Sequence, residues 1–85
     1  MVYNTPNDGD TYSGTSQVII KDGNGNTITN VMGSVYNVGD GGQQLTGLSN
    51  IYIPVGANVY INVKEMNASN TKSFSGSYHI QNWQP

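Results

Sequence analysis

The sequence predicts a small all-β protein, either an antiparallel β-sandwich or a Greek-key barrel of about six strands. Apolar and polar residues alternate along several short segments, as they do in strands with one buried face. Clusters of Gly, Asn and Asp separate these segments and favour tight turns. No window carries apolar residues at the i, i+3, i+4, i+7 spacing of an amphipathic helix. With 85 residues, we expect a single β domain spanning residues 1–85.

The expected strands follow one another with a turn signal between them. Residues 17–21 and 27–31 flank Asp22-Gly23-Asn24-Gly25-Asn26, whose residues tolerate the positive φ angles of a hairpin turn. A shorter strand over residues 34–38 ends at a glycine-rich stretch. Residues 50–55 and 58–64 are expected to form a second hairpin around Pro54 and Gly56, and residues 72–82 form the last strand.

The composition excludes several functions. The chain has three lysines, no arginine, five acidic residues and a formal net charge of −2, which leaves no cationic cluster for a nucleic-acid backbone. No apolar run approaches the roughly 20 residues that span a bilayer, so we expect no transmembrane segment. The absence of cysteine excludes disulfides and thiolate catalysis. A sheet protein of this size buries little apolar surface, so we expect protected sheet edges or self-association, such as a homodimer.

The first residues, Met-Val-Tyr-Asn-Thr-Pro, carry neither a basic segment nor an apolar core. We therefore expect no secretory signal in this sequence. A cytosolic protein and a mature extracellular form both fit, because the absence of cysteine leaves the compartment open.

The titratable residues indicate no enzyme. His79 is the only histidine, and no Gly-x-Ser-x-Gly turn provides a nucleophile for it. Paired-carboxylate chemistry needs a carboxyl group removed from water, whereas most of the acidic residues lie beside glycine or in turns. We expect no cofactor, and calcium is the one alternative. Hard cations accept loop oxygens, so weak calcium binding by Asp8, Asp10 and Asp40 remains open.

Outward-facing aromatic and amide side chains are the most informative feature. If Val59, Ile61 and Val63 point into the core, Tyr60 and Asn62 between them point outward. The same alternation exposes Tyr52 upstream, and downstream it exposes Ser75, Ser77, His79, Gln81 and Trp83. A sugar can stack its apolar face on an aromatic ring while neutral amides bond its hydroxyls. The candidate ligand-binding residues are Tyr52, Tyr60, Asn62, Gln81 and Trp83.

These residues predict a non-enzymatic, lectin-like recognition protein that binds a cell-surface glycan. A lipid headgroup suits the same amphipathic surface. A small cytolytic or insecticidal toxin acting on membranes is a second function class, motivated by a nearly uncharged surface rich in Ser, Thr, Asn and Tyr. Cross-strand aromatic pairing that only stabilises the sheet, or a dimer interface, would explain the same aromatic residues.

Short segments of the chain resemble the βγ-crystallin family of Greek-key proteins. Tyr12-Ser13-Gly14, preceded by Tyr3, and Phe74-Ser75-Gly76 resemble the corner of that family's folded hairpin. Residues 49–56, Ser-Asn-Ile-Tyr-Ile-Pro-Val-Gly, look like its serine-containing strand and the turn joining its two motifs. The resemblance implies Greek-key topology and a calcium-stabilised structural protein as a third function class. The family's own calcium site is not carried over, because residues 45–48, Leu-Thr-Gly-Leu, stand where its Asn or Asp ligands would be.

Overall fold

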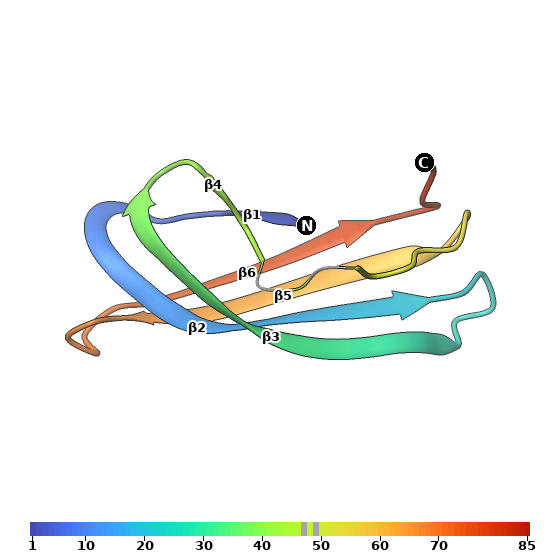
Figure 1. Ribbon diagram of the computed structural model, residues 1–85, viewed down its shortest axis with the longest axis horizontal. Coiled ribbons are helices and arrows are strands. Elements are labelled where there is room, and N and C mark those ends of the chain that lie inside the picture. Colours follow the sequence, from blue (N-terminus) through green and yellow to red (C-terminus); the bar gives the residue numbers. More distant parts are fainter. Residues whose placement is uncertain (47, 49) are drawn as a thin grey trace.

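Six strands in two antiparallel sheets make up the chain in a computed structural model that describes residues 1–46, 48 and 50–85 (Figure 1). The strands are β1 Val2–Asn4, β2 Asn7–Lys21, β3 Thr27–Asp40, β4 Gln43–Leu45, β5 Asn58–Asn67 and β6 Ser73–Ile80. β1 pairs with β4, and the other four strands form a sheet of order β3-β2-β5-β6. This confirms the all-β class and favours the sandwich over the barrel, because the described four-stranded sheet stays open at β3 and β6. The described residues contain no helix that could cross a membrane.

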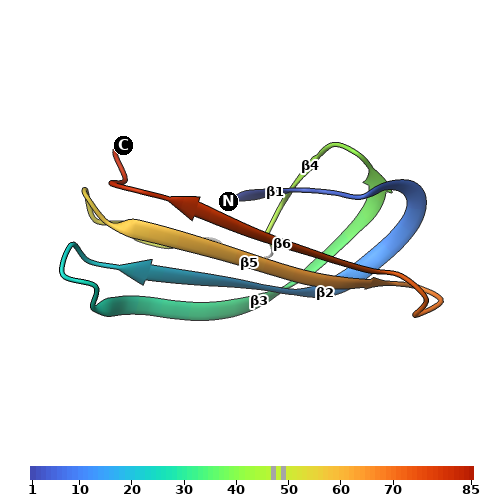
Figure 2. The same cartoon turned by 180° about the vertical axis from the view of Figure 1, so that it is seen from behind.

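The β2–β3 hairpin supplies the longest strands, 15 and 14 residues, of a molecule that measures 42 × 19 × 19 Å. Both strands bend strongly at the end near β1 and β4 (Figures 1 and 2). At the other end, Asp22 Oδ1 accepts hydrogen bonds from the backbone N–H groups of Asn24 and Asn26, both at 2.9 Å. Gly25 adopts a φ of 84° there. The hairpin expected around residues 22–26 is confirmed.

Alternation sorts the side chains of the four-stranded sheet onto two faces. The inner face gathers branched aliphatic residues of its two middle strands, which are buried: Val18, Ile20, Val59, Ile61 and Val63. Tyr3 of β1 covers this face and is itself buried, and Ile51 and Ile53 pack against the same core from the segment before β5. We call the opposite face of this sheet, which β1 and β4 do not cover, the outer face.

Two of the predicted strands differ from the structure. Residues 34–38 are not a separate strand but continue β3, because the ladder with β2 runs unbroken past Gly33 and Ser34. Residues 50–55 form no strand and no hairpin with β5: Asn50 has a φ of 58°, and Pro54 has no N–H to donate to a ladder. β1, β4 and residues 7–16 of β2 were not predicted, because β1 and β4 have only three residues each and residues 7–16 are mostly polar. Gly47 and Ser49, which belong to the segments quoted for the crystallin resemblance, lie outside the described residues.

A glycine in the middle of the sheet lets β2 and β5 approach closely. Gly14 lies opposite Glu65, and a Cβ atom on Gly14 would lie 1.9 Å from the backbone oxygen of Lys64. The Glu65 side chain is buried on the inner face, where its Oε1 accepts hydrogen bonds from Asn37 Nδ2 at 2.6 Å and from the Tyr3 hydroxyl at 3.4 Å. These contacts join β5 to β3 and to β1 across the two sheets.

Candidate functional site

The five residues predicted to bind a ligand do not share one surface. Tyr60 and Asn62 lie on the outer face of β5, as expected. Tyr52 is 79% exposed, but its neighbours Ile51 and Ile53 pack against the core from the inner side. The sheet therefore separates Tyr52 from Tyr60, and the two rings cannot contact one small ligand.

Gln81 and Trp83 lie beyond the end of β6 and do not continue its alternation. Asn82 between them adopts a φ of 50°, which turns the chain. The Trp83 N–H then donates to the carbonyl of Ala57 at 2.9 Å, and its own carbonyl accepts from the N–H of Gly56 at 2.8 Å. The half-buried Trp83 lines an apolar groove of about 720 Å³ together with Val2, Ile53 and residues of β6 that include Ser77 and His79. Gln81 is exposed near this end of the sheet.

The outer face presents three rows of side chains that each cross all four strands. From β6 to β3 the rows are Ser75, Lys64, Thr15 and Ser34; Ser77, Asn62, Gln17 and Met32; and His79, Tyr60, Ile19 and Asn30. Ser77 Oγ donates to Asn62 Oδ1 at 3.0 Å, and Asn62 Nδ2 donates to Gln17 Oε1 at 3.4 Å. Gln17 Nε2 in turn donates to Asn30 Oδ1 at 3.0 Å. This chain of hydrogen bonds follows the second row from Ser77 to Gln17 and ends on Asn30 of the third row. We call Ser77, Asn62, Gln17 and Asn30 the amide row; its hydrogen bonds hold these side chains in defined positions.

Tyr60 and His79 stack beside the amide row. Their ring centroids lie 4.3 Å apart and the rings are within 9° of parallel. From β2, on the other side of β5, Lys21 places Nζ 5.6 Å from the centroid of the Tyr60 ring. Tyr60 therefore takes part in the cross-strand pairing that was the alternative interpretation of the aromatic residues. His79 is exposed on an edge strand, so the ring face turned away from Tyr60 is open to a ligand.

The charged side chains on the outer face are cationic. Lys64 stands in one of its rows and Lys21 lies over Tyr60, whereas no acidic residue occurs in the three rows. The carboxylate of Asp22 is bonded to its own turn, and Glu65 faces the core. Asp40 Oδ1 accepts a hydrogen bond from Thr5 Oγ1 at 3.1 Å. A neutral or anionic ligand on the outer face thus meets no carboxylate in the rows.

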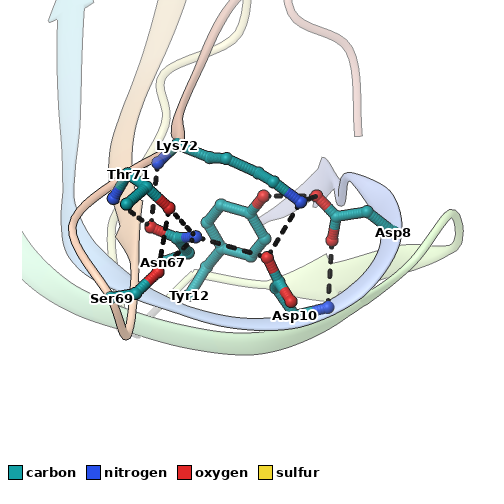
Figure 3. A network of polar contacts seen from close by, with 7 residues as sticks. All are labelled: Asp8, Asp10, Tyr12, Asn67, Ser69, Thr71 and Lys72. Carbon is teal, nitrogen blue, oxygen red and sulfur yellow. Dashed lines mark hydrogen bonds and ion pairs between the residues drawn. The ribbon is translucent and has the colours of Figure 1, made fainter.

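Two of the three predicted calcium ligands, Asp8 and Asp10, belong to an ion-paired network near the β5–β6 turn (Figure 3). Lys72 Nζ lies 3.1 Å from Asp10 Oδ2 and 3.7 Å from Asp8 Oδ2, so an ammonium group already takes the place of a cation between them. The third, Asp40, bonds to Thr5 instead. Within the part of the chain that the structure describes, no three His, Asp or Glu side chains gather as metal ligands.

Asn67, the last residue of β5, joins this network to the β5–β6 turn (Figure 3). Its Oδ1 accepts hydrogen bonds from the backbone N–H groups of Thr71 at 2.8 Å and Lys72 at 2.9 Å. Its Nδ2 donates to Asp10 Oδ2 at 3.2 Å. The side chain is buried, and its contacts are those of a structural residue that holds the turn against β2.

We expect the Asp8 network to make folding sensitive to acid. The Tyr12 hydroxyl donates to Asp8 Oδ2 at 2.5 Å; this bond, and then one from the N–H of Asp10, lowers the pKa of Asp8 from its ordinary value of 3.8. A carboxyl group with a lowered folded-state pKa contributes its full stability above pH 3.8 and loses it as the pH falls through the folded-state value. Asp8→Asn should therefore lower the melting temperature at neutral pH.

Thermal melts of both proteins from neutral to strongly acidic pH would check this expectation. The difference in melting temperature between wild type and Asp8→Asn should shrink towards zero as the pH falls below 3.8. Tyr12→Phe, which removes the donor to Asp8, should show a smaller acid dependence than wild type. A difference between wild type and Asp8→Asn that is constant over the whole pH range would contradict the assigned role of the Asp8 charge.

Three residues of the outer-face site were not among those predicted to bind a ligand: His79, Ser77 and Gln17. Alternation places Ser77 and His79 outward, but a single sequence does not show which residue of β6 lies beside which residue of β5. Gln17 could have been found from its position before Val18, because its side chain must point outward once Val18 is buried. The assembled site is built on paired strands, which position side chains more rigidly than loops do. Comparison with known protein families, with curated proteins and with solved structures finds no match for this chain.

Proposed function

We propose that the protein is a non-enzymatic recognition protein that binds a glycan on its outer face. The observation that carries the proposal is the amide row, which crosses the sheet beside the exposed ring of His79 on a face whose rows contain no carboxylate. The proposed contact residues are His79, Ser77, Asn62 and Gln17. Tyr60 stacks against the other face of the His79 ring and fixes the orientation of that ring.

The open face of His79 suits the apolar face of a sugar ring. Stacking against a flat ring gains contact area at a low cost in conformational entropy when the ring is already fixed. The parallel contact with Tyr60, at 4.3 Å between centroids, supplies that restraint. His79 therefore replaces Tyr60 as the expected stacking platform, because the faces of Tyr60 are turned towards His79 and Lys21.

The amide row suits the hydroxyl groups of the same sugar. An amide NH₂ group has two donor hydrogens and its carbonyl oxygen has two lone pairs. Asn62 Nδ2 and Gln17 Nε2 each make one hydrogen bond within the row, which leaves each a second N–H for a ligand. Lys64 lies two residues along β5 from Asn62, about 7 Å away, so a carboxylate or sulfate on a neighbouring sugar could pair with its ammonium group.

A glycan array probed with the full chain, followed by calorimetric titration with the best glycan, tests the proposal. His79→Ala and Asn62→Ala should each weaken binding by about tenfold or more, which corresponds to about 1.4 kcal/mol. His79→Phe, which keeps a flat ring, should retain most of the affinity. Tyr52→Ala is the matched control, since it removes a more exposed ring from the other side of the sheet and should leave binding unchanged.

Three outcomes would contradict the proposal. Loss of binding in Tyr52→Ala with normal binding by His79→Ala would place the ligand on the other side of the sheet. Binding to phosphatidylcholine liposomes, with no glycan retained on the array, would indicate a lipid headgroup as the ligand. No binding to either would remove the recognition function of this face.

A further inference from the structure

β3 is an edge strand with one side open. It pairs with β2 on one side, and no described strand pairs with the other. Such an edge presents a row of N–H and C=O groups that can pair with a further strand. β3 is 14 residues long, whereas β6, the other edge strand of this sheet, has 8. The longer edge is therefore the stronger candidate for pairing between molecules.

β3 carries few of the features that usually prevent such pairing: its one bulge lies near its start, at Ile28. From Thr27 to Gly39 it contains no charged residue and no proline, the residue types that commonly protect an edge. Of the eleven large apolar side chains that are exposed among the described residues, β3 carries five. Met32, Tyr36 and Val38 lie on the outer side of the strand, and Ile28 and Val31 line a hollow with Ile51 and Tyr52. β6 carries only one of the eleven, Ile80. An apolar row at an open edge indicates a contact surface rather than a solvated one.

We infer that β3 pairs antiparallel with β3 of a second copy of this chain, about a two-fold axis at Met32. In this register Met32 lies opposite the second Met32, and Asn30 lies opposite Ser34. On the outer face, apolar side chains then meet apolar ones and polar side chains meet polar ones, as in stable cross-strand pairs. Moving the axis to Ser34 would instead set the polar Asn30 against the apolar Val38.

A second copy fits this edge better than an unrelated strand. The paired segment is uncharged, so two chains of net charge −2 meet without like charges placed opposite each other. The contact uses the same surface on both molecules and therefore closes at two copies. Pairing over residues 28–36 covers roughly 30 Å of an edge about 10 Å thick, hence roughly 600 Å² in total. This area lies in the range of weak, reversible complexes.

The dimer would form one continuous eight-stranded sheet with both outer faces on the same side. The inference stands on the edge of β3 alone and does not depend on the proposed glycan binding. If that function holds as well, the dimer presents two glycan sites on one surface, and a multivalent glycan would bind more tightly than a single sugar.

Sedimentation velocity of the full chain over a concentration series tests the dimer. The wild-type protein should shift reversibly from monomer to dimer between micromolar and millimolar concentrations. Met32→Lys, which sets two ammonium groups opposite each other, should remain monomeric, and Tyr36→Lys provides a second variant of the same edge. Ile80→Lys on β6 is the matched control and should still dimerise. Circular dichroism shows whether each variant is folded.

Single cysteines test the register, because the chain contains no cysteine of its own. Met32→Cys should form an intermolecular disulfide quickly, since residues at the axis lie within the 4.4–6.8 Å Cα separation of a disulfide. Ser34→Cys should form it slowly, because the two copies of residue 34 lie about 13 Å apart along the strands. Ser75→Cys, an exposed serine on the other edge strand, is the control. A wild-type protein that is monomeric at millimolar concentration, or Ser75→Cys that oxidises as fast as Met32→Cys, would overturn the inference.

Discussion

Gly14→Ala should destabilise the protein by more than about 3 kcal/mol. The added Cβ would lie 1.9 Å from the backbone oxygen of Lys64 and 2.8 Å from the Cα of Glu65. Both atoms belong to the backbone of β5, so no side-chain rotation relieves the overlap and the two central strands must move apart. A small domain has only about 5–15 kcal/mol of stability. Urea denaturation followed by circular dichroism measures the loss.

Gly23→Ala is the matched control for Gly14→Ala. Gly23 lies in the hairpin turn, and a Cβ atom there would meet nothing within 4 Å. Its substitution should change the free energy of unfolding by no more than about 0.5 kcal/mol. Equal effects of the two substitutions would show that β2 and β5 are not packed as closely at Gly14 as the structure has them.

Asn67→Ala should cost about 2–4 kcal/mol of stability. The substitution leaves the backbone N–H groups of Thr71 and Lys72 without the acceptor that Asn67 Oδ1 provides at 2.8 and 2.9 Å. It also removes the donor to Asp10, so the β5–β6 turn loses a link to β2. Hydrogen exchange should show faster exchange at residues 68–72 before the rest of the sheet is affected.

Asn70→Gly is the control in the same turn. Asn70 has a φ of 56°, a conformation that glycine adopts without strain, so this substitution should change the stability by less than about 1 kcal/mol. If Asn67→Ala were as mild as Asn70→Gly, the side chain of Asn67 would not hold the turn.

The strands that the sequence predicts correctly are those whose buried side chains are branched aliphatics. β5 alternates Val59, Ile61 and Val63 with polar residues, and its position was predicted from that pattern. The first half of β2 turns Tyr12, Gly14 and Ser16 inward, so its buried face carries no periodic apolar signal. Close backbone approach at Gly14 and the hydrogen bond from the Tyr12 hydroxyl to Asp8 hold that half, and neither appears in a hydropathy pattern.

Alternation identifies the side of the chain on which a residue lies but not the neighbour it meets. Residues 50–55 show the limit: Ile51 and Ile53 do pack against the core, yet from an irregular segment on the far side of the sheet from Tyr60. Tyr52 was therefore correctly expected to be exposed and wrongly grouped with Tyr60. The pairing of Tyr60 with His79 depends on the register of β5 and β6, and that register follows from the whole sheet rather than from either strand.

Backbone amide chemical-shift mapping of the ¹⁵N-labelled chain with a bound oligosaccharide would show which face of the sheet binds the glycan. We predict that the largest shifts occur at Gln17, Asn62, Ser77 and His79, with little change at Tyr52. Glycan binding on the outer face would be contradicted if the largest shifts occurred at Val2, Ile53 and Trp83, which line the apolar groove, with little change at Gln17 and Asn62. It would also be contradicted if His79→Ala left the pattern of shifts unchanged.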